Sequence, residues 1–176
     1  FYPAYLEANF LIKNSIFTVK IGDKQEPVEI RGKIDRIDLD ASGQEVVIIE
    51  YKRSSASVQD PQKGVADSIY FQLPLYLIAA KNFLKNKKIC GAFSYVFREG
   101  KRRKGVLTKQ ILGRNSLITN EEMEDLLEMT IVKVQEKLNG IADGNFFVKP
   151  FDFKRCVPNS CEFFDLCRID PKSFRF

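Results

Sequence analysis

Alternation of apolar and polar residues along the first half of the chain predicts a group of β-strands. Residues 28–38 (VEIRGKIDRID) alternate charged and apolar positions, the pattern of a strand with one buried face. Residues 45–52 follow a DASG turn and contain four consecutive β-branched residues, which is typical of a strand buried on both faces. Together with residues 8–20, expected to be a strand that bends near Asn14 and Ser15, these segments predict an antiparallel meander.

Apolar residues further along the chain predict helices and two more strands. Residues 67–85 predict an apolar helix, in which Pro74 requires either a kink or a start nearer Phe71. Residues 88–97 and 105–112 predict two strands that are joined by a basic hairpin.

The second predicted helix begins at a capping box, in which Thr119 and Glu122 stand three residues apart. It should cover about 120–139 and end at Gly140. Residues 53–66 are polar and predict an exposed loop. The order β-β-β-α-β-β-α predicts an α/β or mixed α+β fold, with a central mixed sheet flanked by helices.

Length and composition predict one domain with its own core. The chain has 176 residues, of which 44% are hydrophobic, so we expect residues 1–176 to form one domain. Residues 143–176 should be a Phe-rich tail that packs on it. No apolar run reaches the roughly 18 residues of a membrane-spanning helix, and no secretory signal is visible, so we expect a cytoplasmic protein without membrane contact. Because the first residue is Phe, we expect a fragment of a longer protein.

The absence of histidine limits the chemistry that these residues can perform. It excludes Ser-His-Asp triads and His-ligated zinc, so catalysis would use carboxylates, Lys, Tyr or Cys, and oxygen atoms would bind any hard metal. The net charge is +5, and part of it is concentrated in residues 101–104. This run fits either a contact with a polyanion or a solvated hairpin tip.

Two charged residues stand at the end of the most apolar strand. Glu50 and Lys52 are two positions apart, so they share a face. Asp35 joins that face if it pairs with residue 48 or 50, but not with 49. Two carboxylates would then suit Mg²⁺ or Mn²⁺, and the lysine could hold the attacking water or stabilise the transition state. Taken alone, an E-x-K pair is more often a surface ion pair, worth about 0–1 kcal/mol.

Three segments in order, GKIDRID (32–38), IIEYKRSS (48–55) and FQLPLY (71–76), resemble the PD-(D/E)xK nuclease superfamily. They are most similar to RecB-like nuclease domains of helicase–nuclease subunits, including AddB-type proteins. The resemblance implies a restriction-endonuclease-like core and a metal-dependent DNA exonuclease from a DNA repair enzyme. It also implies two partners, DNA as single strands or duplex ends and a helicase domain or subunit.

The same resemblance implies a role for each matching residue. Asp35, Glu50 and the backbone carbonyl of Tyr51 match metal ligands for Mg²⁺ or Mn²⁺, Lys52 matches the catalytic lysine, and Gln72 and Tyr76 match a Q-x-x-x-Y motif that supports the site. Lower-ranked candidates for contacts with DNA phosphates are Arg36, Arg53, Lys101, Arg102, Arg103 and Lys104.

Two other functions stay open for this chain. One is a stand-alone single-strand exonuclease of the CRISPR-associated type, and the other is an inert DNA-binding or structural module of the same fold. Many relatives carry a further His or Glu ligand upstream of the first strand. We expect the corresponding residue upstream in the parent protein, in which case this fragment alone would bind metal weakly or be inactive.

Three cysteines in the tail, Cys156, Cys161 and Cys167, have the spacing C-x4-C-x5-C. The second spacing resembles the C-x2-C-x5-C tail with which several RecB-like nucleases bind a [4Fe–4S] cluster, and the first spacing differs. A fourth thiolate would be needed, and Cys90 reads as an ordinary buried residue. An iron–sulfur cluster in the full-length protein, a zinc site and unligated thiols all stay open.

Overall fold

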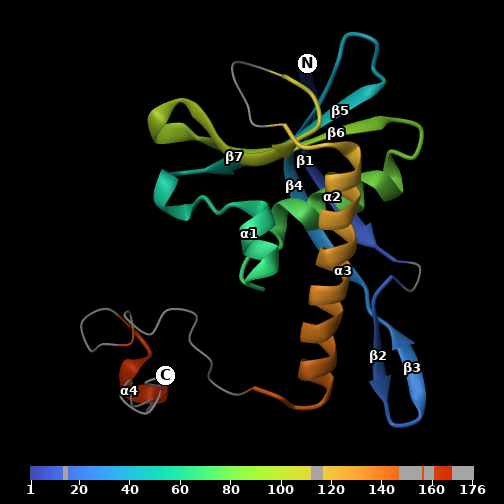
Figure 1. Cartoon of the computed structure of the whole chain (residues 1–176), viewed down its shortest axis with the longest axis vertical. Helices are drawn as coiled ribbons and strands as arrows, with labels where there is room; N and C mark the ends of the chain where they lie inside the picture. The colour runs from blue at the N-terminus through green and yellow to red at the C-terminus, as the bar shows by residue number, and fades with distance from the viewer. Residues whose placement is uncertain (14–15, 112–116, 147–155, 157–160, 168–176) are drawn as a thin grey trace.

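A five-stranded mixed sheet forms the centre of the computed structural model, which describes residues 1–13, 16–111, 117–146, 156 and 161–167 (Figure 1). The strand order is β1-β4-β5-β6-β7, and only β5 and β6 are parallel. The strands are β1 (Tyr2–Ile12), β4 (Ile30–Leu39), β5 (Glu45–Lys52), β6 (Lys88–Val96) and β7 (Lys101–Leu107). The predicted mixed α/β fold is therefore confirmed.

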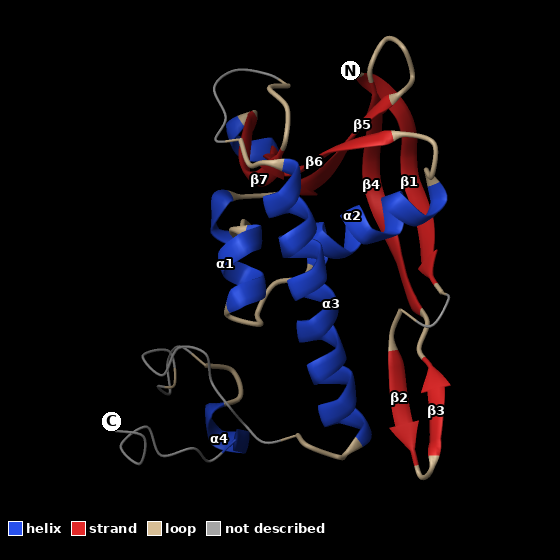
Figure 2. Cartoon of the chain, turned by 45° about the vertical axis from the view of Figure 1, so that its right-hand side comes forward, coloured by secondary structure: helices blue, strands red, loops and turns tan. Residues whose placement is uncertain are grey.

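Helices cover one face of this sheet (Figure 2). The crossover between the parallel strands β5 and β6 contains α1 (Pro61–Ala66) and α2 (Gln72–Phe83), as a parallel connection requires. α2 packs on β1, β5 and β6, and α3 (Asn120–Ala142) packs against α2. Side chains such as Ile48 and Leu77 form the main core between the sheet and the helices.

The opposite face of the sheet carries a second, smaller hydrophobic cluster. Val47 and Ile49 of β5 lie in it, whereas Val46 and Ile48 lie in the main core. β5 is therefore buried on both faces, as its run of β-branched residues predicts.

A separate hairpin replaces part of the predicted first strand. The segment expected as one strand over 8–20 ends as β1 at Ile12, and β2 (Thr18–Ile21) pairs with β3 (Lys24–Pro27) instead. Asn14 and Ser15, the predicted bend, lie outside the described residues. The hairpin packs on α3, where Gln135 Oε1 accepts a hydrogen bond from the Thr18 backbone at 3.0 Å.

The loop prediction for residues 53–66 is wrong, because the segment contains a 3₁₀ turn (Ser55–Ser57) and α1. Asp60 caps α1 by accepting a hydrogen bond from the Lys63 backbone N–H at 3.2 Å, and Pro61 occupies the first helical position. An Asp-Pro pair is a helix start signal that the polar composition of the segment concealed.

Both long helices follow their local signals. α2 begins after Phe71, so Pro74 is its third residue, where the missing N–H breaks no intrahelical bond. The capping box of Thr119 and Glu122 is confirmed, although α3 continues through Gly140.

The basic run of residues 101–104 belongs to β7, so the predicted basic hairpin tip is wrong. The turn before it consists of Phe97–Glu99 and Gly100, whose φ of 58° suits glycine.

The C-terminal tail is described only in part. It includes α4 (Phe164–Cys167), but most of residues 147–176 lie outside the described residues, so its packing on the domain stays a prediction. None of the helices in the described part of the chain is long and apolar enough to cross a membrane.

Candidate active site

The β4–β5 ladder stops just before the charged end of β5. Pairing runs from Leu39 opposite Val46 to Arg36 opposite Ile49, which places Asp35 opposite Glu50. Continued pairing would direct the Tyr51 backbone N–H to the β4 backbone. Instead this N–H donates to Oδ2 of Asp35 at 2.8 Å. The register therefore brings Asp35 to the end of β5, on the face of Glu50.

Glu50 is the buried centre of this arrangement. Only 1% of it is exposed, and it accepts hydrogen bonds from Lys52 Nζ at 2.5 Å and from the Tyr70 hydroxyl at 3.0 Å. The Ser94 hydroxyl lies 3.5 Å from Oε2. These partners compensate for the burial of a carboxylate. The interpretation of Glu50 and Lys52 as a surface ion pair is therefore wrong.

Lys52 connects Glu50 to α2. Its ammonium group donates to Oε1 of Gln72 at 3.0 Å, and Nε2 of Gln72 donates to the Tyr76 hydroxyl at 2.9 Å. Gln72 and Tyr76 are four residues apart, so one helix face presents both of them. Burial raises the pKa of Tyr76, so its hydroxyl stays protonated and retains a hydrogen to donate.

Tyr70 is a member of the site that sequence reasoning missed. Burial first, and the charge of Glu50 second, raise the pKa of Tyr70 well above its ordinary value, so its phenol remains a donor to Glu50. The sequence offered only a tyrosine two positions before Gln72, inside a segment predicted as helix. Tyr70 lies just before α2, which begins after Phe71, and its hydroxyl reaches Glu50 from there.

The oxygen atoms at the end of β5 fit a hard divalent cation. Oδ1 of Asp35 has no hydrogen-bond partner among the described residues, and Oε1 of Glu50 accepts only from Lys52, so both oxygens retain lone pairs. The carbonyl of Tyr51 points to the same edge of β5 as its N–H, which is the Asp35 side. Two carboxylates and a carbonyl suit Mg²⁺, which usually keeps several waters. Within the described ranges no group of three His, Cys, Asp or Glu side chains is placed to hold a metal, so water and substrate would complete the shell.

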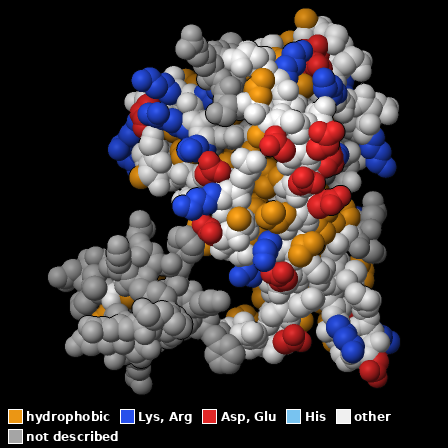
Figure 3. Space-filling model, in the orientation of Figure 1, with side chains coloured by type: hydrophobic (Ala, Val, Ile, Leu, Met, Phe, Trp, Pro, Cys, Tyr) orange, Lys and Arg blue, Asp and Glu red, His pale blue; other side chains and the backbone are white. Residues whose placement is uncertain are grey.

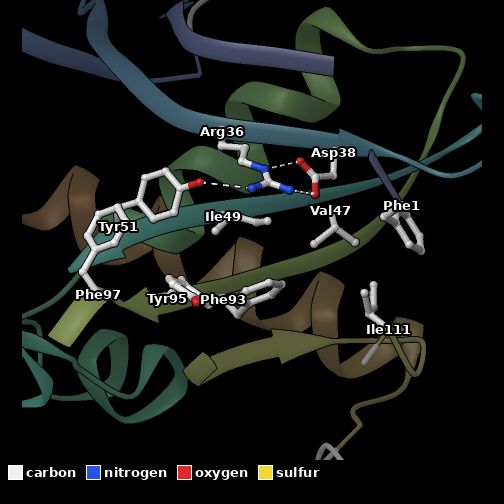
Figure 4. A pocket seen from close by; sticks show the side chains of 10 residues that line it. All are labelled: Phe1, Arg36, Asp38, Val47, Ile49, Tyr51, Phe93, Tyr95, Phe97 and Ile111. Carbon is white, nitrogen blue, oxygen red and sulfur yellow. Dashed lines mark hydrogen bonds and ion pairs between the residues drawn. The ribbon is translucent and has the colours of Figure 1, made fainter. Parts of the chain in front are cut away.

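Arg36 lies on the opposite face of the sheet from Glu50 and Lys52. Its guanidinium donates to both carboxylate oxygens of Asp38 at 2.6 Å and to the Tyr51 hydroxyl at 3.2 Å (Figure 4). Both contacts raise the pKa of Arg36, with Asp38 the larger cause. This predicted phosphate contact is therefore committed to a bidentate ion pair away from the candidate metal ligands.

Four of the other basic candidates, residues 101–104, lie in β7, and Arg53 follows β5. Figure 3 shows Lys and Arg side chains gathered on the side of the molecule where β7 lies. Arg103 pairs with Glu99, and Lys104 lies 3.3 Å from Asp60. Arg102 stacks its guanidinium 5.2 Å from the centre of the Phe93 ring. Two of the predicted cations, Lys101 and Arg53, are exposed and have no ion-pair partner within the described ranges.

The tail cysteines do not form a metal site in the part of the chain that the structure describes. Cys156 is buried and Cys161 and Cys167 are half-buried. Among the described residues, no three Cys, Asp or Glu side chains lie close enough together to hold a metal ion, and the chain has no histidine. The spacing prediction of an iron–sulfur cluster thus gains no support.

Three comparisons with known proteins bear on this site. A family model described as the PD-(D/E)XK nuclease superfamily matches residues 1–168. No curated protein matches the chain. Among solved structures, the crystal structure of SSO0001 matches at 18% identity and a TM-score of 0.36. The match covers 93% of this chain and 59% of that one, so this chain spans about three fifths of its length.

Proposed function

Because this chain belongs to the PD-(D/E)XK nuclease superfamily, we propose that it is a DNA exonuclease domain that hydrolyses phosphodiester bonds. The superfamily typically uses Mg²⁺. The observation that supports the proposal most strongly is that Asp35, Glu50 and Lys52 lie on one face at the end of β5. The donor set at this point suits a hard cation, and the adjacent ammonium group suits a phosphate.

Asp35, Glu50 and the Tyr51 carbonyl would bind Mg²⁺, which when bound lowers the pKa of a coordinated water and neutralises charge on phosphorus. Each carboxylate is oriented by a hydrogen bond from the protein. The Tyr51 N–H holds Asp35, and the Tyr70 hydroxyl holds Glu50. Such second contacts fix ligands in a productive geometry and limit their motion.

Lys52 has one donor left for the reaction. A lysine ammonium carries three N–H groups, and two of them go to Glu50 and Gln72. The third can hold the attacking water or stabilise the negative charge that develops on a phosphate oxygen. Since the other two bonds fix the position of Nζ, little reorganisation is needed when the substrate arrives.

Gln72 and Tyr76 position this lysine rather than react. The Gln72 amide must present its oxygen to Lys52, because an ammonium group only donates, and this leaves its NH₂ group for the Tyr76 hydroxyl. The Lys52 ammonium group is thereby held by Glu50 of β5 and by Gln72 of α2.

We also propose that the domain belongs to a RecB- or AddB-like helicase–nuclease. The support for this context is the order and spacing of the three sequence motifs alone. A [4Fe–4S] cluster in the full-length protein rests only on the cysteine spacing. Absorption near 400 nm in anaerobically purified full-length protein, lost on substitution of Cys161 by Ser, is the measurement that tests it.

Digestion of end-labelled single-stranded and duplex DNA in Mg²⁺ tests the catalytic proposal. We expect stepwise release of nucleotides from an end, loss of activity in EDTA, and a rate about 100- to 1,000-fold lower in Lys52→Ala. Lys81→Ala is the matched control, because Lys81 is exposed on α2 and pairs with Glu124. Undiminished cleavage by Lys52→Ala would refute the assignment, and binding of DNA without cleavage by the full-length protein would favour the inert module.

A further inference from the structure

A cavity of about 320 Å³ lies against β5 and β6 on the face of the sheet opposite to Glu50 and Lys52 (Figure 4). Aromatic rings form much of its wall, and the ion pair of Arg36 and Asp38 lies on its β4 side. Nε and Nη2 of Arg36 donate to the Asp38 carboxylate, and Nη1 donates to the Tyr51 hydroxyl, so this wall carries little net charge. A flat, neutral ligand with polar edges fits such a pocket better than a free anion does.

Three aromatic rings are held together at the end of the cavity nearest the catalytic residues. The rings of Tyr51 and Phe97 stack with centroids 4.7 Å apart and an interplanar angle of 27°. Tyr95 contacts both of them edge-on, at 6.1 and 6.0 Å. Phe97 is nevertheless 62% exposed. Its ring is thus oriented by the protein while much of its surface remains available for another aromatic ring.

This aromatic group is connected directly to the strand end that carries Lys52. Tyr51 lies between Glu50 and Lys52 in sequence, and Lys52 pairs with Val96, the residue before Phe97. Beyond this pair, the Arg98 backbone N–H donates to the Arg53 carbonyl at 3.4 Å. Lys52 on one face of the sheet and the aromatic rings on the other face therefore both lie at the ends of β5 and β6. A polymer that passes these strand ends would contact both.

Basic groups surround the same edge and would complement a polyanion. Arg53, Arg98 and Lys101 are exposed, and no ion-pair partner for them lies in the described part of the chain. Arg102, over the ring of Phe93, has a buried nitrogen without a hydrogen-bond partner among the described residues. An unsatisfied guanidinium N–H is costly, and an acceptor oxygen from a ligand would relieve that cost.

We propose that the stacked pair Tyr51–Phe97 receives an unpaired base of the nucleic acid strand that is cut at Lys52. This inference rests on the proposed nuclease function and narrows its substrate to a single strand or a frayed duplex end. Aromatic side chains beside a basic groove are the usual means of holding unpaired bases without regard to sequence. A base within a duplex is already stacked on both sides and cannot occupy the surface.

Fluorescence of 2-aminopurine, which is quenched when this base stacks, tests the proposal. Single-stranded oligonucleotides carrying 2-aminopurine at successive positions are titrated with the protein in Ca²⁺, and a gel verifies that they stay intact. We expect quenching at one or two adjacent positions near the cleaved end and none in a fully paired duplex. In Phe97→Ala the quenching is lost and binding weakens about 5- to 150-fold, whereas Phe97→Trp retains both. Phe83→Ala, which removes another exposed phenylalanine, should behave as the wild type.

Several results would overturn the proposal. These are the absence of quenching by the wild type at every position, equal quenching by Phe97→Ala, and equal quenching of the paired duplex. Sedimentation velocity tests whether a second copy of the chain occupies this surface instead of a base. If the wild type is a dimer, Phe97→Ala is a monomer and quenching is unchanged, the surface serves self-association. Failure of the base-stacking proposal can be distinguished from failure of the nuclease proposal. The nuclease proposal is tested by cleavage in the wild type and by the loss of cleavage in Lys52→Ala.

Discussion

Oδ2 of Asp35 lies 2.8 Å from the backbone nitrogen of Tyr51 and accepts its hydrogen bond where the β4–β5 ladder ends. The Asp35 carboxylate therefore accepts the last hydrogen bond between β4 and β5 with Oδ2, while Oδ1 has no hydrogen-bond partner among the described residues. The β4–β5 pairing ends at Arg36 and Ile49, so the Asp35 side chain takes the place of a backbone acceptor for Tyr51.

Two substitutions at Asp35 should separate its structural role from metal binding. Asp35→Asn keeps an oxygen that can accept from Tyr51 but loses the charge, so we expect the free energy of unfolding to change by less than about 1 kcal/mol. Calorimetric titration with Ca²⁺ or Mn²⁺ should show weaker binding. Asp35→Ala also loses the acceptor and should be about 1.5–3 kcal/mol less stable in urea denaturation. Unchanged metal binding by Asp35→Asn would contradict the ligand assignment.

Tyr70→Phe should weaken the site without touching any residue of the sequence motifs. The substitution removes the hydrogen bond to the buried Glu50 carboxylate, so we expect a loss of about 1.5–3 kcal/mol in the free energy of unfolding. The Mg²⁺ concentration needed for half-maximal cleavage should rise, because Glu50 is less well oriented. Tyr5→Phe is the control, since Tyr5 is exposed on β1 and its hydroxyl has no hydrogen-bond partner among the described residues. Equal effects of the two substitutions would argue against a specific role for Tyr70.

Asp40→Asn should destabilise the protein in a pH-dependent way. The Ser42 hydroxyl first, and the backbone N–H groups of Gln44 and Glu45 as well, hold the pKa of Asp40 well below its usual range. A carboxyl with a lowered folded-state pKa stabilises above its unfolded value of about 3.9, and this contribution is lost as the pH falls further. Urea denaturation should therefore show Asp40→Asn less stable than the wild type at pH 7, with a gap that narrows below about pH 4.

The exposed turn residue Asp23 provides the control for this pH dependence. Asp23→Asn should leave stability close to that of the wild type at both pH values. A gap between Asp40→Asn and the wild type that is as large at pH 3 as at pH 7 would contradict the assigned cause.

Gly91 and Gly140 should respond in opposite directions to substitution by alanine. Gly91 has a φ of 130° in β6, and an added Cβ would lie 2.0 Å from the carbonyl oxygen of Val106. We expect Gly91→Ala to lower the free energy of unfolding by about 2–6 kcal/mol, because backbone strain and overpacking add together. Outside the backbone of α3 itself, no atom of the described residues lies within 4 Å of a Cβ added at Gly140, so Gly140→Ala should raise the free energy of unfolding by up to about 1 kcal/mol. Urea midpoints of the two variants that coincide would contradict both expectations.

Local patterns located much of the secondary structure. The run of β-branched residues at 46–49 predicted the bounds of β5, and the Thr119–Glu122 capping box predicted the start of α3. Both signals act through neighbours in sequence, by side-chain burial on a strand or by hydrogen bonds within one helical turn. Two of the wrong predictions, the loop at 53–66 and the basic hairpin tip, came from composition and not from such a signal. The strand expected over 8–20 was also wrong, because β1 ends at Ile12 and Thr18 begins a separate hairpin.

The candidate site could be predicted in part from residue order alone. The resemblance to the nuclease superfamily named Asp35, Glu50, Lys52, Gln72 and Tyr76, and strand alternation placed Glu50 and Lys52 on one face. The position of Asp35 depended on register, because a shift of one residue would have moved it to the other face. Tyr70 and the Tyr51–Phe97 stack could not be read from the chain, since their partners lie 20 and 46 residues away in sequence. Contacts of that kind arise from the packing of strands and helices, for which no local periodicity carries a signal.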